Sequence, residues 1–300
     1  MSVMIRTENL TKFYGKNRGV IDLNLEVQRG EIFGFLGPNG AGKTTTIRTL
    51  LDFIRPTRGS ATIFGLDSRR DSLEIRKRTG YMLADLTLYR NMTAADFLRY
   101  FGHLRGGVEW RFVQELAERL ESDLSQPIRA LSRGNRQKIG LIQALMHRPE
   151  LLILDEPSSG LDPLIQREFY NMITEARDDG RTALLSSHIL PEVERVCDRV
   201  GIIREGRLIT VEHVASLKER ALRRLEIRFA APVTAEVFAG LPGVSDLQVE
   251  NNILHCTVMG SLDPIIKAAA RLPVVDLISH QPSLEEVFMT YYGGGDEHAK

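Results

Sequence analysis

Eight consecutive residues have the types and spacing of a loop that cradles phosphate groups. They match the pattern G-x-x-x-x-G-K-[ST] and are Gly37, Pro38, Asn39, Gly40, Ala41, Gly42, Lys43 and Thr44. The glycines permit positive φ angles and let backbone N–H groups approach phosphate oxygens without an intervening Cβ. Lys43 would reach the β- and γ-phosphates, and the Thr44 hydroxyl would bind magnesium. Chance would give roughly 0.006 such matches in this composition, so the pattern predicts binding of a nucleoside triphosphate.

A second group of reactive side chains ends two apolar runs further along the chain. LLILDE places Asp155 and Glu156 at the end of one run, and TALLSSH places His188 at the end of another. Ligands of open parallel sheets collect at the carboxyl ends of strands. We therefore expect Asp155 to hold hydrated magnesium together with Thr44. Glu156 is expected to polarise the attacking water and His188 to contact the γ-phosphate, which makes these two the predicted catalytic residues.

An α/β core with parallel strands would bring these side chains to one place. Strands are predicted at 20–28, 31–36, 151–156 and 182–188, with helices at 44–54 and 164–177. The period of two in 20–28 would bury Ile21, Leu23, Leu25 and Val27. From about 84 to 150, apolar residues recur at helical spacing, which predicts a helical subdomain inserted between core strands.

The end of the chain has the pattern of a separate module, so we predict two domains, residues 1–220 and 221–300. The order βαββαβ in the second domain fits a small ferredoxin-like α+β fold. Its hairpin is expected to turn at Asn251-Asn252, and a short helix is expected within residues 234–241. A terminal helix is predicted over 283–292, followed by a frayed tail.

The composition excludes several classes of protein. Lys plus Arg (39) equals Asp plus Glu (39), which argues against a dedicated nucleic-acid binder. No run approaches the ~18 to 20 apolar residues that cross a bilayer. The first residues, MSVMIRTENL, lack the apolar core of a signal peptide, so a cytosolic chain is expected. Cys197 and Cys256 have neither metal-like nor redox-like spacing and are expected to be buried, inert thiols.

Five motifs in order resemble those of the nucleotide-binding subunits of ATP-binding cassette (ABC) transporters. They are GPNGAGKTT, LSRGN at 131–135, LLILDEP, SSGLDP and the histidine of SSH. The resemblance covers roughly residues 4–215, and the ending PSLEEVFMTYY is similar to the C-terminal extension of cassettes that serve exporter-type permeases. The resemblance implies an ATPase that powers export of a small molecule, such as a drug or antibiotic, through a separate permease.

The same resemblance implies further site residues. Tyr14 would stack on adenine, and Thr45 would touch the α-phosphate. Ser132 and Gly134 retain the serine and one glycine of the family's LSGGQ signature, which contacts the γ-phosphate bound by another cassette. Asp162 would carry communication across that dimer. ATP and Mg²⁺ are therefore the expected cofactors.

Two departures from the family pattern stand out. Arg133 and Asn135 replace two signature positions, a change that we expect to be tolerated because the serine and Gly134 remain. Ala84 stands where the family carries glutamine or glutamate, and alanine neither coordinates magnesium nor bonds a water. Asp85 is the neighbouring carboxylate that would have to substitute.

The resemblance implies that a chain with one phosphate loop and one signature needs a second cassette, either another copy or a related subunit. It also implies an integral-membrane permease, which would hold the chain at the cytoplasmic face of the membrane; nucleic acid is not an expected partner. The alternative is a soluble cassette ATPase acting on ribosomes or DNA, but such proteins usually join two cassettes or carry long coiled-coil insertions. A GTPase switch is disfavoured because the sequence has no N-K-x-D motif. The transported substrate is not encoded in the motifs of this chain.

Overall fold

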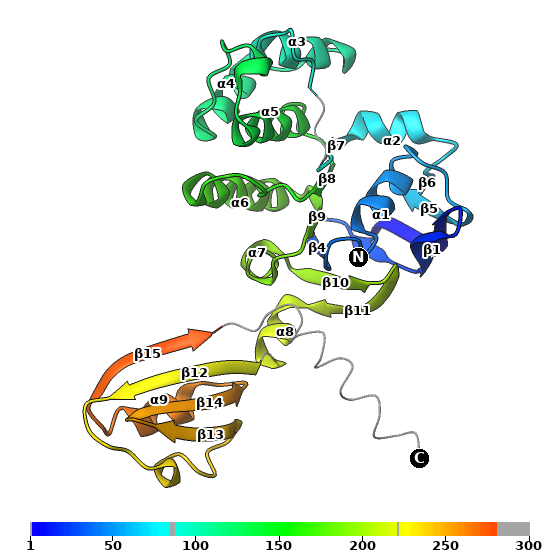
Figure 1. The fold of residues 1–300 in the computed structure, drawn as a ribbon. Helices are drawn as coiled ribbons and strands as arrows, with labels where there is room; N and C mark the ends of the chain where they lie inside the picture. Colours follow the sequence, from blue (N-terminus) through cyan, green and yellow to red (C-terminus); the bar gives the residue numbers. More distant parts are fainter. Residues whose placement is uncertain (1, 85–87, 221, 281–300) are drawn as a thin grey trace. The chain divides into compact units, whose positions relative to one another are not determined.

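The computed structural model describes residues 2–84, 88–220 and 222–280 (Figure 1). Two units can be separated, Met1–Glu212 and a second that begins at His213. The charged segment that ends near the predicted boundary at 220 is a helix, α8 (Val214–Arg220), and it is grouped with the second unit. Asp85, the predicted helix over 283–292 and the predicted tail lie outside the described residues.

A six-stranded sheet forms the centre of the first unit, in the order β11-β10-β4-β9-β8-β7 (Figure 1). Its strands are β4 (Ile32–Leu36), β7 (Thr79–Met82), β8 (Leu151–Asp155), β9 (Thr182–Ser187), β10 (Arg199–Arg204) and β11 (Arg207–His213). The pairs from β10 to β7 are all parallel. Every residue of β4, β8 and β9 is buried, as in parallel sheets that are covered on both faces. The predicted α/β core is present.

A second, antiparallel sheet has the path β2-β1-β5-β6, and β3 also pairs with β1. Its strands are β1 (Val3–Tyr14), β2 (Asn17–Leu23), β3 (Glu26–Gln28), β5 (Arg58–Ile63) and β6 (Leu66–Asp67). The single strand predicted over 20–28 is therefore wrong. Asp22 has a φ of 49° and its N–H donates to Thr11 Oγ1 at 2.9 Å, which interrupts the alternation. Val20 is consequently buried in place of the half-buried Ile21, and the chain forms two strands.

Eight helices connect the described strands of the first unit. They are α1 (Lys43–Leu50), α2 (Ser72–Arg78), α3 (Ala94–Leu104), α4 (Trp110–Arg119), the 3₁₀ turn η1 (Ile128–Ala130), α5 (Arg133–Leu145), α6 (Pro163–Asp178) and α7 (Leu190–Val196). Helices α3, α4 and α5 follow β7 and precede β8 in the sequence, and they lie together in one group (Figure 1). A Cβ on Gly80 of β7 would lie 2.0 Å from the Ala144 carbonyl oxygen, so glycine is needed where α5 crosses β7. None of the helices that the structure describes is long and apolar enough to cross a membrane.

The second unit contains a four-stranded antiparallel sheet in the order β13-β14-β12-β15. Its elements are β12 (Leu222–Phe229), η2 (Ala235–Val237), β13 (Val244–Glu250), β14 (Ile253–Met259), α9 (Asp263–Ala269) and β15 (Val274–His280). Asn251 and Asn252, with φ of 48° and 68°, form the predicted hairpin turn. The helix expected within 234–241 is a single 3₁₀ turn.

The two cysteines are free and buried, as predicted. Burial raises the pKa of Cys256 to about 11 and raises that of Cys197 as well. Both thiols therefore stay protonated at neutral pH, which makes them poor nucleophiles.

One histidine of the first unit is held in its neutral form by its surroundings. Burial, and to a smaller extent the positive charge of Arg105, lower the pKa of His147 to about 4. The Arg105 guanidinium is itself fixed nearby, since it donates to the carbonyls of Arg76, Lys77 and Thr79. In the unfolded chain, His147 binds a proton as the pH falls below about 6.5. In the folded chain, it does so only near pH 4, so the unfolded chain binds more protons between these values.

The free energy of unfolding should therefore decrease as acid is added across this window. Between about pH 7 and about pH 5, the wild-type chain should lose about 1 to 2 kcal/mol more than His147→Gln, in which no imidazole titrates. Chemical denaturation of both chains at the two pH values measures the difference. Equal losses in the two chains would contradict the assignment.

Candidate nucleotide-binding site

The predicted phosphate loop connects β4 to α1. Gly40 and Gly42 have positive φ angles of 77° and 112°. A Cβ on Gly37 would lie 2.3 Å from the Ile203 carbonyl oxygen, and one on Gly42 would lie 2.8 Å from that of Gly19. Helix α1 begins at Lys43 with neither a side-chain cap nor an acidic residue in its first turn. Its N-terminal N–H groups and positive dipole end are therefore suited to an anion.

A cavity of about 340 Å³ lies over this loop. Its lining comprises Arg18, Gly19, Asn39, Gly40, Ala41, Gly42, Lys43, Thr44, Thr45, Ala84 and Glu156. Most of the residues predicted to hold the nucleotide thus line one cavity. Gly37 and Pro38 do not line it, and their backbone carbonyls accept hydrogen bonds from Lys43. Ala84 does lie at the cavity, where it offers only a methyl group.

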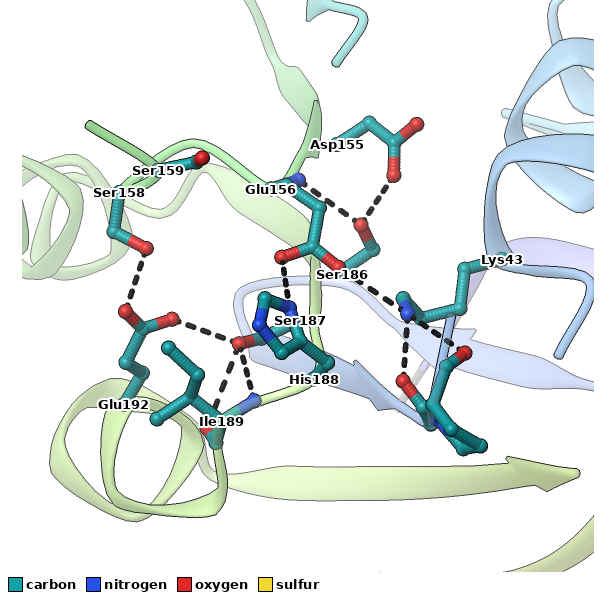
Figure 2. Close-up of polar contacts among 12 residues, drawn as sticks. Lys43, Asp155, Glu156, Ser158, Ser159, Ser186, Ser187, His188, Ile189 and Glu192 are labelled. Atoms are coloured by element: carbon teal, nitrogen blue, oxygen red, sulfur yellow. Dashed lines mark hydrogen bonds and ion pairs between the residues drawn. The ribbon is translucent and has the colours of Figure 1, made fainter. Parts of the chain in front are cut away.

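The Lys43 ammonium is buried and lies close to three oxygen atoms (Figure 2). Its Nζ donates to the carbonyls of Gly37 at 2.6 Å and Pro38 at 3.2 Å. It also lies 3.2 Å from Glu156 Oε1, an ion pair between the loop and the end of β8. The positive charge is therefore fixed beside both the phosphate loop and the predicted catalytic carboxylate.

Asp155, which is completely buried, connects three elements of the site. The Thr44 hydroxyl donates to its Oδ2 at 2.6 Å, and the Ser186 hydroxyl donates to its Oδ1. A hydroxyl and a carboxylate are the hard oxygen donors that suit Mg²⁺. Within the described part of the chain, no group of three or more His, Cys, Asp or Glu residues could hold a metal. The Thr44 hydroxyl and the Asp155 carboxylate, 2.6 Å apart, fit a cation whose other ligands are the oxygens of a nucleotide.

Glu156 and His188 meet beyond the ends of β8 and β9 (Figure 2). Glu156 has a φ of 51°, and its N–H donates to Ser186 Oγ at 3.1 Å. Its Oε2 lies 2.8 Å from His188 Nδ1. The buried Gln137 of α5 donates to the backbone carbonyls of Glu156 and Pro157, both at 3.2 Å, and so holds the loop that carries the carboxylate.

Tyr14, predicted from the resemblance to stack on adenine, ends β1, is 45% exposed and is not among the residues that line the cavity. A Cβ on Gly19 would lie 3.1 Å from Tyr14 Cε2 and 2.9 Å from Thr45 Cγ2. The ring therefore lies beside the end of the phosphate loop, on the side where Thr45 lines the cavity.

Ser132, Gly134 and Asp162 do not line this cavity. Ser132 Oγ caps α5 by accepting from the Asn135 N–H at 3.2 Å, and Asp162 caps α6. A Cβ on Gly134 would lie 2.6 Å from the Gly160 carbonyl oxygen, so the signature helix begins against the loop that follows Glu156. Ser132 and Asp162 are exposed.

Sequence reasoning missed Arg18, Gly19, Gln137 and Ser186. Arg18 and Gly19 come from a β-strand in the other sheet, and no spacing in the sequence relates them to the phosphate loop. Ser186 had a signal, because it directly precedes the Ser187-His188 pair at a predicted strand end. Gln137 reads as an ordinary helix residue until the helix is packed.

The fold and the phosphate loop define the chain as a phosphate-loop NTPase. Comparison with known proteins identifies the family within this class. Residues 20–159 match the family model described as ABC transporter. The bacitracin transport ATP-binding protein BcrA of Bacillus licheniformis is 36% identical, covering 98% of this chain and 99% of that protein. The linearmycin resistance ATP-binding protein LnrL of Bacillus subtilis (strain 168) is 30% identical, covering 97% and 98%.

A solved ATP-binding subunit of an ABC transporter has a TM-score of 0.66 and 30% identity, covering 72% of this chain and 92% of its own. The chain therefore belongs to the ATP-binding subunits of the ABC transporter family, and it is an ATPase. The family resemblance stated from the motifs is confirmed.

Lys43→Ala should remove hydrolysis, because the substitution deletes the charge fixed between the loop and Glu156. We expect nucleotide affinity to fall about ten-fold and turnover to fall by more than about a hundred-fold. Calorimetric titration with Mg-ATP and a phosphate-release assay measure the two effects. Lys267→Ala, at an exposed position of the second unit, is the control. Turnover retained by Lys43→Ala would contradict the role of the loop.

Proposed function

We propose that this ATPase powers export of a small molecule, such as a drug or antibiotic, through a separate permease. The observation that carries the mechanism is one cavity in which Lys43, Thr44 and Glu156 converge on the phosphate loop. The names of two relatives support the substrate class, since one is a bacitracin transport protein and the other is a linearmycin resistance protein.

Each residue has a role in holding ATP. The Tyr14 ring would stack on adenine, and the backbone N–H groups of the loop and α1 would bind the β- and γ-phosphates. Thr45 would touch the α-phosphate, and the Lys43 ammonium would neutralise the developing charge on the γ-phosphate. Thr44 and Asp155 would hold Mg²⁺, which when bound draws negative charge from the phosphate oxygens.

Hydrolysis then requires a water oriented toward the γ-phosphate. Glu156 would accept a proton from that water, and His188 would hold the γ-phosphate and keep the carboxylate oriented. The separation of 2.8 Å between Glu156 Oε2 and His188 Nδ1 supports a joint action of the two groups.

A second cassette would complete the site. Ser132, Gly134 and Asp162 lie outside the cavity of their own chain, and Ser132 and Asp162 are exposed. Their placement supports contact with the γ-phosphate bound by another copy or by a related subunit. Only the triphosphate would bridge both halves, so binding closes the dimer and hydrolysis opens it.

The permease would dock on the groove between α2 and α3, which we call the α2–α3 groove. It has a volume of about 570 Å³ and is lined by Leu73, Arg76, Lys77, Tyr81, Phe101, Leu104, Arg105 and Gly106. Leu73 and Leu104 are each 65% exposed. Arg76 and Arg105 donate to backbone carbonyls, and those bonds leave their positive charges uncancelled. A cytoplasmic segment of the permease with acidic and apolar side chains fits this surface and would hold the chain at the cytoplasmic face of the membrane.

The second unit would be a ferredoxin-like accessory domain. Its strand order and its antiparallel pairs support a βαββαβ fold in which the first helical segment is reduced to one 3₁₀ turn. We assign it no chemistry.

Glu156→Gln should bind Mg-ATP and remain a closed dimer, because the amide no longer accepts the proton of the water. Light scattering after gel filtration with Mg-ATP should give twice the monomer mass.

The same variant also tests for the permease. Tagged Glu156→Gln, pulled down from detergent-solubilised membranes of the native host, should recover a polytopic membrane protein that mass spectrometry identifies. The double variant Lys43→Ala, Glu156→Gln is the control that cannot close. If Glu156→Gln recovers ribosomal or DNA-repair proteins and no polytopic membrane protein, the transporter function is contradicted.

Leu104→Glu tests the α2–α3 groove separately. The charge should reduce recovery of the membrane protein by more than about ten-fold, because a carboxylate in place of Leu104 removes an apolar contact and repels the acidic side chains that the groove would receive. ATP binding by the purified chain should not change. Ile266→Glu, at an exposed position of α9, is the matched control. Equal recovery by both variants would place the permease elsewhere.

A further inference from the structure

The sheet does not by itself fix the distance between Glu156 and His188. The last pair of residues in the β8–β9 ladder is Asp155 with Ser186, and the two catalytic candidates lie beyond it. Glu156 turns away with a left-handed φ of 51°. The Glu156 N–H still donates to Ser186, but no ladder pair joins the residues after Glu156 to those on either side of His188.

Glu192 of α7 supplies that connection (Figure 2). Its Oε1 accepts from the Ser158 hydroxyl at 2.7 Å, and its Oε2 accepts from the Ser187 hydroxyl at 2.7 Å. Ser158 follows Glu156 by two residues, and Ser187 directly precedes His188. One carboxylate therefore binds both loops, with one oxygen for each.

The hydrogen bonds have a defined direction. An ionised carboxylate only accepts, so both serines must donate to Glu192. The Ser187 oxygen accepts in turn from the Ile189 N–H at 3.0 Å, which fixes the backbone on either side of His188. Both serine side chains are buried, so water does not readily replace the carboxylate as their partner.

Other side chains hold only one of the two loops. Gln137 donates to the carbonyls of Glu156 and Pro157, and Gln166 of α6 donates to those of Ser158 and Leu161. These bonds fix the loop after Glu156 to α5 and α6. They do not relate that loop to His188.

We propose that Glu192 is a positioning residue for ATP hydrolysis, because its carboxylate bridges the Ser158 and Ser187 hydroxyls and so keeps Glu156 and His188 at hydrogen-bond distance. The inference rests on the roles proposed above for Glu156 and His188. Catalytic groups must be held to within a fraction of an ångström, and a displacement of about 1 Å can reduce the rate on the order of a hundred-fold. Glu192 touches neither the cavity lining nor the phosphate loop, so it acts through the two loops.

The test is the steady-state ATPase activity of three full-length variants. Glu192→Ala should lower kcat on the order of ten-fold, with the KM for ATP changed by less than about two-fold. Glu192→Gln should stay within about two-fold of wild type, since its amide oxygen accepts from Ser187 and its NH₂ group donates to the Ser158 oxygen. Glu194→Ala, on the same helix, is the matched control and should retain full kcat. The melting temperature of each variant is measured, and every assay is run below the temperature at which that variant unfolds.

A second measurement separates the bridge from a general loss of structure. Ser158→Ala and Ser187→Ala should each lower kcat alone, but neither should lower it further on the Glu192→Ala background. Wild-type kcat in Glu192→Ala would overturn the proposal, as would an equal loss in Glu194→Ala or in Glu192→Gln.

Failure of the proposed catalytic roles has a different signature. If Glu156→Gln and His188→Ala keep full activity, those roles are wrong, and Glu192 has nothing to position. If both are slow while Glu192→Ala is fast, the roles stand and the Glu192 inference alone is wrong.

Discussion

The site depends on one buried carboxylate at the end of β8. Asp155 has no exposed surface, and it accepts hydrogen bonds from Thr44 of the phosphate-loop helix and from Ser186 of β9. A buried charge is costly unless it is paired, so the two hydroxyls are held to it. The phosphate loop, β8 and β9 are thereby tied together at one point. The positions of the residues that follow these elements therefore depend on the Asp155 carboxylate.

Glu156 is the first of those residues, and its carboxylate is shared. One oxygen faces the Lys43 ammonium, and the other faces His188. The backbone of the same residue is held by Gln137 from the signature helix and by Ser186. Side chains from several helices thus fix the position of Glu156 and His188. Glu192 of α7 belongs to the same hydrogen-bond network, because it accepts from the Ser158 and Ser187 hydroxyls.

Local patterns predicted well wherever one run of residues decides the outcome. The loop from Gly37 to Thr44 needs glycines where Ile203 and Gly19 approach, so its composition reveals its conformation. The Asn251-Asn252 turn follows from the tolerance of asparagine for positive φ. The single strand over 20–28 was wrong because Asp22, whose N–H donates to the Thr11 hydroxyl oxygen of another strand, lies in the left-handed region.

By itself, the sequence determined the phosphate loop, the acidic end of β8, the histidine after β9 and the family to which these motifs belong. Each depends on residues adjacent in the chain, where steric and hydrogen-bonding preferences act locally. Only the tertiary structure decided that Arg18 and Gly19 line the cavity and that Gln137 holds the loop of Glu156. It also brought Ser158 to Glu192, 34 residues away. Such partners are chosen by the packing of helices against the sheet, and no spacing within the chain encodes that packing.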